Sequence, residues 1–265
     1  MPYTPAHPIT AIAIDKLFPN KFNRTGLVAG TLAPDLMNFV VLRPADTGFG
    51  HSPMGMLTIG LPVSILMCYL FHKLVFPGLV IHLPRPLDRI LYPYVERGWR
   101  IAGARAWTIL VVSIIVGMIS HLFLDGFTHK GGLMYPYTTA FVHWLLPGFG
   151  STNLLLQFGL SVVCVAIELL VFVAFIYRRR DVIHIPEFIS GPAKTGYWSV
   201  VLLSSFGSTA LGLLLYDTGY RRYGLMIVSV ASVTGAVIGF ITASAVFLTA
   251  RRRRPRSDRK QGAGS

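Results

Sequence analysis

The sequence is poor in charge and in cysteine, and both shortages narrow what the chain can be. Charged residues make up 13% of its 265 positions, whereas about a quarter is usual in soluble domains. Its two cysteines, Cys68 and Cys164, lie inside apolar runs with no other cysteine at metal or redox spacing. These features disfavour a soluble domain and exclude a cysteine-based zinc site or disulfide framework.

The chain also lacks a basic stretch followed at once by an apolar core near its start, and it lacks an internal repeat. We therefore expect its own spanning helices, rather than a signal peptide, to direct membrane insertion. The missing repeat disfavours a secondary transporter, because such proteins are often built from repeated halves.

What the sequence does contain is long apolar runs, and 53% of its residues are hydrophobic. Five runs each match or exceed the roughly twenty residues that a helix needs to cross a bilayer. They predict an all-α fold, a polytopic transmembrane bundle of about five spanning helices. The last two runs are rich in small residues, which favours close helix packing. The five runs are Met54–Phe76, Ala106–Phe127, Leu154–Tyr177, Tyr197–Tyr216 and Gly224–Ala250.

The first fifty residues follow a different pattern. A short amphipathic stretch covers Ile9–Phe18, and an apolar stretch over Thr25–Leu42 is interrupted by Pro34 and Asp35. An acid and a proline make a poor lipid-facing span, so we predict interfacial or broken helices here. We expect residues 1–250 to form one integral membrane domain, with residues 1–50 packing over the candidate site and a basic disordered tail at 251–265.

The basic residues are grouped in three segments, and the formal net charge is +13. If the five spans alternate, the segments 73–105, 178–196 and 251–260 share one side, which the positive-inside rule makes cytoplasmic. Because these residues lie between and after apolar runs with few aromatics among them, we expect no specific nucleic-acid partner. The tail is expected to touch anionic lipid headgroups; a DNA-binding tail is the alternative.

His121 and Asp125 are the chemically most informative pair in the chain. They lie four residues apart at the end of the predicted span 106–127, so both side chains share one helical face. His129 follows one turn later if the helix continues. His51 precedes the first span, and if the two spans are antiparallel neighbours it lies at the same end of the bundle.

These residue types suit a divalent metal ion. His and Asp bind zinc, and also manganese or iron. A bound ion with an open position lowers the pKa of water and polarises a carbonyl or phosphoryl oxygen. Asp125 has two carboxylate oxygens and can bridge two ions. We therefore expect a divalent metal cofactor, with zinc as the first choice and one or two ions per chain.

Plainer interpretations exist for each residue alone. A histidine near a membrane interface is commonly hydrogen-bonded or solvated, and we interpret His72, His82 and His184 in this way. Asp125 could close a helix end, and Asp35 could cap a helix. The joint pattern favours a site, because both acids and five of the eight histidines fall on one side of the predicted bundle. These five are His7, His51, His121, His129 and His143.

Two further residues are assigned more loosely. Glu168 lies in the middle of the third run, and an acid there needs a partner. It either hydrogen-bonds another helix or marks a polar pathway, and we do not assign it to the metal site. His143 lies in the loop after His129 and is an additional ligand or a substrate contact.

Four motifs, taken in order, resemble the bacterial membrane family called domain of unknown function 4184. The order also looks like that of inner-membrane metal-dependent hydrolases. More distantly it is similar to zinc-dependent phospholipase C and the S1/P1-type nucleases, which are helical enzymes with a multi-zinc site. The resemblance covers most of the chain, at least through the third span. The motifs are Met-Pro-Tyr-Thr-Pro-Ala-His7-Pro, Gly30-Thr-Leu-Ala-Pro-Asp35, His51-Ser-Pro-Met-Gly55 and Ser120-His-Leu-Phe-Leu-Asp125-Gly-Phe-Thr-His129.

The resemblance implies specific ligand roles. One ion would be held by four side chains, and a second by His7 together with Asp125. His129 and His143 would be candidates for a third ion, but no H-x-x-x-E pair follows His129, which limits the expectation to one or two ions. Asp35 and Asp125 are the candidate catalytic carboxylates. The four ligands of the first ion would be Asp35, His51, His121 and Asp125.

We therefore predict a membrane-embedded, metal-dependent hydrolase that acts on phosphoesters or lipids at the surface of the bacterial inner membrane. Its partners would be membrane lipid and such a substrate, and the cluster would lie on the extracytoplasmic side. The alternative is a non-enzymatic membrane protein, a transporter or an assembly partner, in which the cluster is an ion site or a polar lock. Ligand atoms within metal-bonding reach favour the enzyme, whereas a polar track past Glu168 favours transport.

Overall fold

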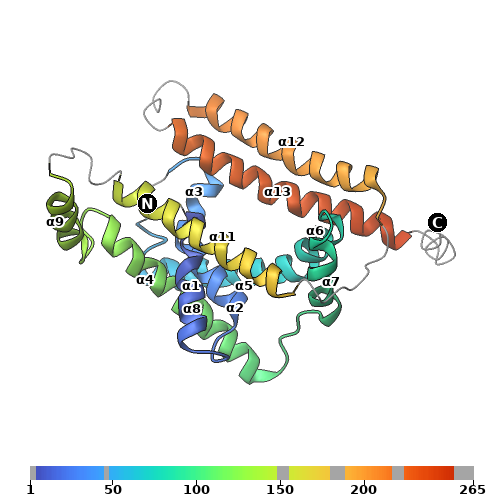
Figure 1. The fold of residues 1–265 in the computed structure, drawn as a ribbon, viewed down its shortest axis with the longest axis horizontal. Helices are drawn as coiled ribbons and strands as arrows, with labels where there is room; N and C mark the ends of the chain where they lie inside the picture. Colours follow the sequence, from blue (N-terminus) through green and yellow to red (C-terminus); the bar gives the residue numbers. More distant parts are fainter. Residues whose placement is uncertain (1–3, 45–47, 148–154, 180–188, 217–223, 254–265) are drawn as a thin grey trace. The chain divides into compact units, whose positions relative to one another are not determined.

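A computed structural model describes residues 4–44, 48–147, 155–179, 189–216 and 224–253 of the chain. Within these residues all regular structure is helical, and they include no strand (Figure 1). The predicted all-α fold is confirmed. Of the predicted basic tail, residues 254–265 lie outside the described part of the chain.

Five of the described helices are long and apolar enough to cross a membrane, which confirms the expected number. The chain is therefore a multi-pass membrane protein whose spanning helices contact lipid. The first span extends to His82 rather than to the predicted Phe76, because the helix continues through two π-helical turns. The five spans are Pro53–His82, Gly103–Thr128 (α8), Leu155–Arg179, Gly191–Tyr216 (α12) and Gly224–Ala250.

Two of the spans are composite. The first consists of α4 (Pro53–Gly55), η3 (Met56–Gly60), α5 (Leu61–Leu70), η4 (Phe71–Val75) and α6 (Phe76–His82). The third consists of η5 (Leu155–Gly159) and α11 (Leu160–Arg179), and the last belongs to α13 (Gly224–Arg253).

The N-terminal segment forms the broken helices that the sequence predicts. They begin with η1 (Thr4–Ala6) and α1 (Pro8–Leu17), and Pro8 suits the first turn because its missing N–H has no helical partner there. The side chain of Asn23 accepts a 2.9 Å hydrogen bond from the backbone N–H of Gly26 and so caps the next helix. The chain then continues through α2 (Arg24–Leu32), η2 (Ala33–Asp35) and α3 (Leu36–Val40).

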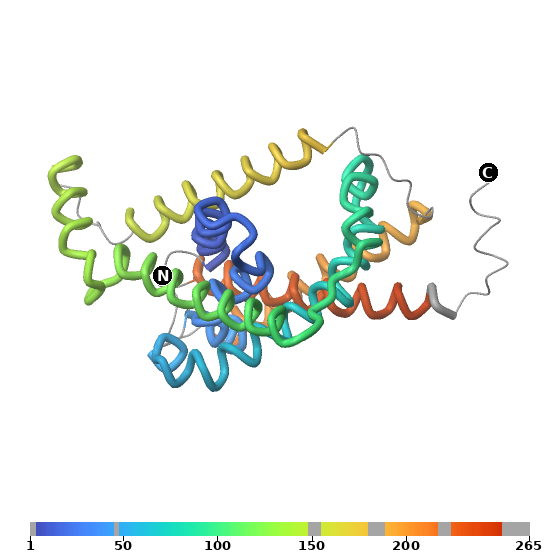
Figure 2. Tube along the Cα trace, turned by 90° about the horizontal axis from the view of Figure 1, so that it is seen from below, coloured from blue at the N-terminus to red at the C-terminus, as the bar shows by residue number. Residues whose placement is uncertain are grey.

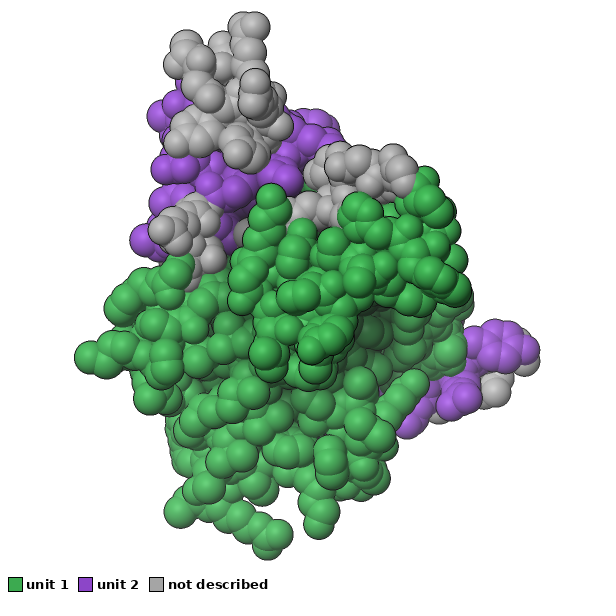
Figure 3. All heavy atoms as spheres, turned by 90° about the vertical axis from the view of Figure 1, so that its left-hand side faces the viewer, with its two compact units in different colours: residues 1–36, 47–68, 101–175 green, residues 37–46, 69–100, 176–265 purple. Residues whose placement is uncertain are grey.

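The chain divides into two compact units, which Figure 3 shows in two colours. Unit 1 contains Met1–Leu36, Thr47–Cys68 and Ile101–Phe175, and unit 2 contains Met37–Asp46, Tyr69–Arg100 and Ile176–Ser265. The assignment of residues 1–250 to a single membrane domain stays a prediction.

In unit 1, α2 packs along α8 at a very close crossing. A Cβ atom on Gly30 would overlap the backbone carbonyl of Ile114, and one on Gly117 would overlap the carbonyl of Leu27. Glycine at both positions lets the two backbones approach, as small residues do in membrane helix pairs. The crossing brings the backbone of Thr31 beside the last turns of α8, where the candidate ligands lie.

In unit 2, α12 and α13 lie side by side along their length (Figure 1), and α6 and α7 (Leu87–Arg97) pack near one end of this pair. Tyr197 is fully buried there, and its hydroxyl lies 3.0 Å from Oγ of Ser244. Lys194 Nζ donates to Asp88 Oδ2 at 2.9 Å, which joins α12 to α7. Helix α7 lies in a stretch that the sequence analysis treats as a basic loop.

Candidate metal centre

The six residues that the sequence predicts as metal ligands converge at the C-terminal end of α8, within unit 1. His121 and Asp125 come from α8, and His129 follows it. His7 and Asp35 come from the N-terminal segment, and His51 comes from the turn before α4.

Three donor atoms form a nearly equilateral triangle. Nε2 of His51 lies 3.3 Å from Nε2 of His121 and 3.3 Å from Oδ2 of Asp125, and the third side measures 3.4 Å. Donors bonded to one tetrahedral zinc ion at about 2.0–2.1 Å are themselves about 3.3–3.4 Å apart. The triangle therefore has the spacing of three ligands of a tetrahedral ion.

Asp35 adds a second carboxylate next to these donors. Its Oδ1 lies 3.9 Å from Nε2 of His51, and its Oδ2 lies 3.9 Å from Nε2 of His121. These two distances involve different oxygens, so the carboxylate lies beside the triangle and not at the spacing of a fourth tetrahedral ligand. The hydroxyl of Thr4 donates a 2.7 Å hydrogen bond to Oδ2 and holds the carboxylate in place. Asp35, His51 and His121 thus form a second group of donors with metal-ligand spacing.

The carboxylate of Asp125 faces two sets of donors. Its Oδ2 belongs to the triangle, whereas its Oδ1 lies 3.2 Å from Nε2 of His7 and 3.5 Å from Nδ1 of His129. His7, His121 and Asp125 also form a group whose ligand atoms all lie within 4.8 Å of one another. This is the arrangement of a carboxylate that can bridge two ions.

Backbone carbonyls orient two of the rings. Nδ1 of His121 lies 2.7 Å from the carbonyl oxygen of Thr31, and Nδ1 of His7 lies 3.3 Å from that of Thr4. A carbonyl only accepts hydrogen bonds, so each neutral ring carries its proton on Nδ1 and presents the lone pair of Nε2. Those lone pairs face the oxygens of Asp125, a contact that requires a proton or a cation between the atoms.

Burial makes the cluster costly without such a cation. His7, Asp35 and His121 are completely buried, and groups of this kind need compensation inside an apolar protein. The side chains of His51 and His129 are 21% and 32% exposed. The cluster is therefore closed on most sides and accessible beside these two rings.

Burial favours the neutral form of His7 and His129, the two histidines of the cluster that flank helices α1 and α8. Burial lowers the pKa of His7 below its usual 6.5, although the hydrogen bond to Asp125 acts in the opposite direction. Burial also lowers the pKa of His129, again against the charge of Asp125. A neutral imidazole is the form that binds a metal ion, which suits His7 as a ligand, whereas His129 belongs to neither group of described residues with metal-ligand spacing and its Nδ1 lies 3.2 Å from the backbone carbonyl oxygen of Asp125.

His143 and Glu168 lie apart from this arrangement. His143 is exposed on α9 (Tyr135–Leu145) and belongs to neither group of described residues with metal-ligand spacing. The carboxylate of Glu168, on α11, accepts a hydrogen bond from the backbone N–H of Ile9, while its Oε1 is buried without a hydrogen-bond partner. Glu168 therefore contacts the start of α1, which matches the interhelical interpretation of this acid.

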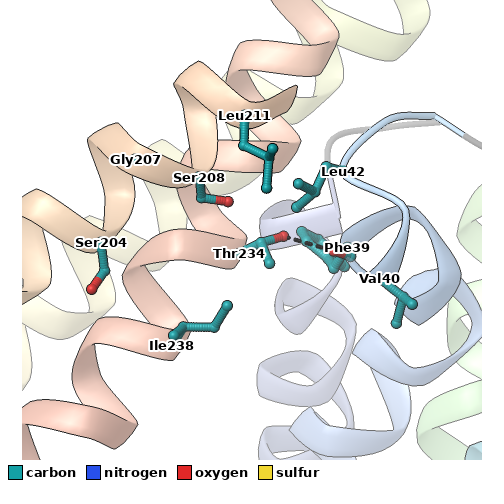
Figure 4. A pocket seen from close by; sticks show the side chains of 9 residues that line it. All are labelled: Phe39, Val40, Leu42, Ser204, Gly207, Ser208, Leu211, Thr234 and Ile238. Atoms are coloured by element: carbon teal, nitrogen blue, oxygen red, sulfur yellow. Dashed lines mark hydrogen bonds between the residues drawn. The ribbon is translucent and has the colours of Figure 1, made fainter. Parts of the chain in front are cut away.

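Unit 2 contains an apolar groove of about 620 Å³ between α3, α12 and α13 (Figure 4). The hydroxyl of Thr234 closes part of its wall by donating to the carbonyl of Phe39 at 3.0 Å. Nothing that lines the groove is titratable, so it offers no acid, base or metal ligand. Its lining residues are Phe39, Val40, Leu42, Ser204, Gly207, Ser208, Leu211, Thr234 and Ile238.

Sequence reasoning missed the groups that support the ligands. The backbone carbonyls of Thr4 and Thr31 have no sequence signal of their own, because every residue has a carbonyl. The hydroxyl of Thr4 had a weak signal, since it lies in the same N-terminal motif as His7. Helix α9 was also missed, although its aromatic residues recur at helical spacing.

Comparison with known proteins gives one family. The model of the family described as "Domain of unknown function (DUF4184)" matches residues 1–248 of the chain. No curated protein and no solved structure matches the chain.

Proposed function

Since the chain belongs to the DUF4184 family, whose description assigns no activity, we propose a function from the site itself: a membrane-embedded, metal-dependent hydrolase of phosphoesters. One observation carries the proposal. Three His and Asp donors have the spacing of tetrahedral zinc ligands, Asp35 lies 3.9 Å from two of them beside the fourth position, and the side chains of His51 and His129 are partly exposed. Catalytic zinc sites combine protein ligands with an open position in this way.

The chemistry follows from the ligand set. A bound zinc ion supplies a water of lowered pKa and polarises a phosphoryl oxygen. Asp35, oriented by Thr4 and 3.9 Å from Nε2 of His51, accepts the proton from the attacking water. Asp125 holds the rings of His7 and His129 through Oδ1. His129, the more exposed of the two rings, faces the incoming substrate, and the leaving oxygen takes its proton from water.

The site also has a proposed side of the membrane. The three basic segments would be cytoplasmic by the positive-inside rule, which places the His/Asp cluster at the extracytoplasmic surface. A substrate presented by membrane lipid would reach the cluster there.

The test is hydrolysis of bis(4-nitrophenyl) phosphate by the purified full-length chain in detergent. We expect turnover that stops on chelation and returns with added zinc. His121→Ala and Asp125→Ala should lower kcat/KM by at least about 100-fold, whereas the control His143→Ala should change it by less than about twofold. A zinc-loaded wild type without activity, or variants as active as wild type, would overturn the proposal and favour the ion-site or polar-lock alternative.

A further inference from the structure

Helix α9 is a short, uncharged and largely exposed helix that belongs to none of the five spans. Its sequence YPYTTAFVHWL contains no Asp, Glu, Lys or Arg. Tyr137, Phe141 and Trp144 are 72%, 59% and 74% exposed, and their spacing of four and three residues puts them on one helical face. Such a face is unfavourable in water and needs an apolar or interfacial surrounding.

The length of α9 excludes a transmembrane position. Its 11 residues make a helix about 16 Å long, which is half of the roughly 30 Å hydrocarbon core. It therefore cannot span the bilayer. Tyrosine and tryptophan concentrate where lipid headgroups meet the hydrocarbon, because each has an apolar ring and a polar group.

Helix α9 also contacts a span with exposed apolar side chains near its end. Helix α8 is a membrane span, and its Ile119 and Phe123 are 55% and 62% exposed close to its C-terminal end. The two helices contact each other, and in Figures 1 and 2 α9 follows the end of α8 within unit 1. An exposed apolar face that extends a membrane-facing helix is covered by the same lipid.

Helix α9 is fixed to the turn that carries the candidate ligands. The hydroxyl of Thr138 donates to the carbonyl of Phe127 at 2.7 Å, and the N–H of Met134 donates to the carbonyl of Gly126 at 3.2 Å. Asp125 and His129 belong to the same short stretch of chain. The depth of α9 in the membrane therefore sets the depth of these two residues.

We propose that α9 is an interfacial helix whose Tyr137–Phe141–Trp144 face docks in the lipid headgroup layer and holds the His/Asp cluster at that depth. The occupant of this face is the lipid surface itself. The proposal extends the proposed function, because an ester linked to a headgroup is then presented directly to the cluster.

The docking is tested without any activity measurement. The full-length chain is reconstituted into vesicles of phosphatidylethanolamine and phosphatidylglycerol with brominated acyl chains. Fluorescence that is present in wild type and missing in Trp144→Phe reports on Trp144. We expect this component to be quenched by the brominated lipid and protected from aqueous iodide. Quenching by iodide without quenching by brominated lipid would overturn the docking of α9.

A second arm tests the consequence for the substrate. We expect Phe141→Ala with Trp144→Ala to lower hydrolysis of vesicle phospholipid by at least about tenfold, while hydrolysis of bis(4-nitrophenyl) phosphate changes by less than about twofold. The matched control is Leu203→Ala with Phe206→Ala, two exposed side chains of α12, and it should change neither rate. Equal losses on both substrates would overturn the role of α9 in substrate presentation.

The two proposals fail in different ways. If wild type hydrolyses neither substrate while Trp144 is quenched by brominated lipid, the hydrolase is wrong and the interfacial helix stands. If both substrates are hydrolysed and Trp144 is exposed to iodide, the hydrolase stands and the interfacial helix is wrong.

Discussion

At the scale of single residues, the site is organised around the carboxylate of Asp125. Its two oxygens face different histidines, and this follows from its position one helical turn after His121. Spacing and the order of the spans were enough to predict that His51, His121 and Asp125 meet. The order of the spans placed His7 and Asp35 only on the same side of the bundle, and the resemblance was needed to assign them as ligands, because no periodicity connects the N-terminal segment to the end of α8.

Because the two carboxylate oxygens of Asp125 face different histidines, Asp125→Ala and His7→Ala should lower the metal content by different amounts. Asp125→Ala removes a donor from both groups, so metal content should fall to nearly zero. His7→Ala removes a donor only on the Oδ1 side, so metal content should fall by at most one ion per chain. Elemental analysis of the purified variants measures both values. Equal metal contents in the two variants would show that Asp125 is not shared.

The buried histidines predict how metal binding depends on pH. A proton and an ion compete for the same nitrogen lone pair, so zinc is released as the pH falls. Burial lowers the pKa of His7 below 6.5, so this ring stays neutral at pH values where an ordinary histidine is half charged. In zinc titrations between about pH 5 and pH 8, we expect the zinc affinity to fall as the pH falls. An affinity that does not change with pH would contradict the role of the histidines as ligands.

At the scale of elements, the long helices and the broken helices of the N-terminal segment were predictable, whereas α7 and α9 were not. Spans of about twenty apolar residues are visible in any sequence, and all five agree with the structure. Helices α7 and α9, of 11 residues each, are too short for that signal. Helix α7 is joined to α12 by the ion pair between Asp88 and Lys194, and such a tertiary contact is not visible in sequence patterns.

The close crossing of α2 and α8 predicts a sensitive position. In Gly117→Ala the added methyl group meets the carbonyl of Leu27, and the helices must separate. We expect a loss of about 1–3 kcal/mol in stability and weaker metal binding, because Thr31 moves away from His121. Gly207→Ala on α12 is the control, since no atom lies within 4 Å of its added Cβ. Thermal unfolding and metal content in detergent measure both effects, and equal behaviour of the two variants would contradict the account.

At the scale of the whole molecule, hydropathy predicts the number of spans and the loop charges predict their orientation. The division into two compact units was not predictable, because it depends on contacts between helices far apart in sequence. The orientation rests on the basic segments at one side of alternating spans. In the proposed orientation the end of α8 and helix α9 would lie outside the cytoplasm.

Labelling of introduced cysteines tests that orientation. Lys130 is exposed just after His129, and Arg97 is exposed in the first basic segment. A membrane-impermeant maleimide should label Lys130→Cys in intact cells and Arg97→Cys only after permeabilisation. The two native cysteines, Cys68 and Cys164, are buried and should give little background. The reverse labelling pattern would invert the proposed topology.

The central claim is that the His/Asp cluster holds a metal ion, and X-ray absorption at the zinc edge of the purified chain tests it most directly. We predict at least one zinc ion per chain, bound by four nitrogen and oxygen donors at about 2.0–2.1 Å, with the scattering pattern of imidazole. The spectrum should disappear in His121→Ala and persist in His143→Ala. A sulfur-containing shell, or zinc that is retained in His121→Ala, would contradict the account.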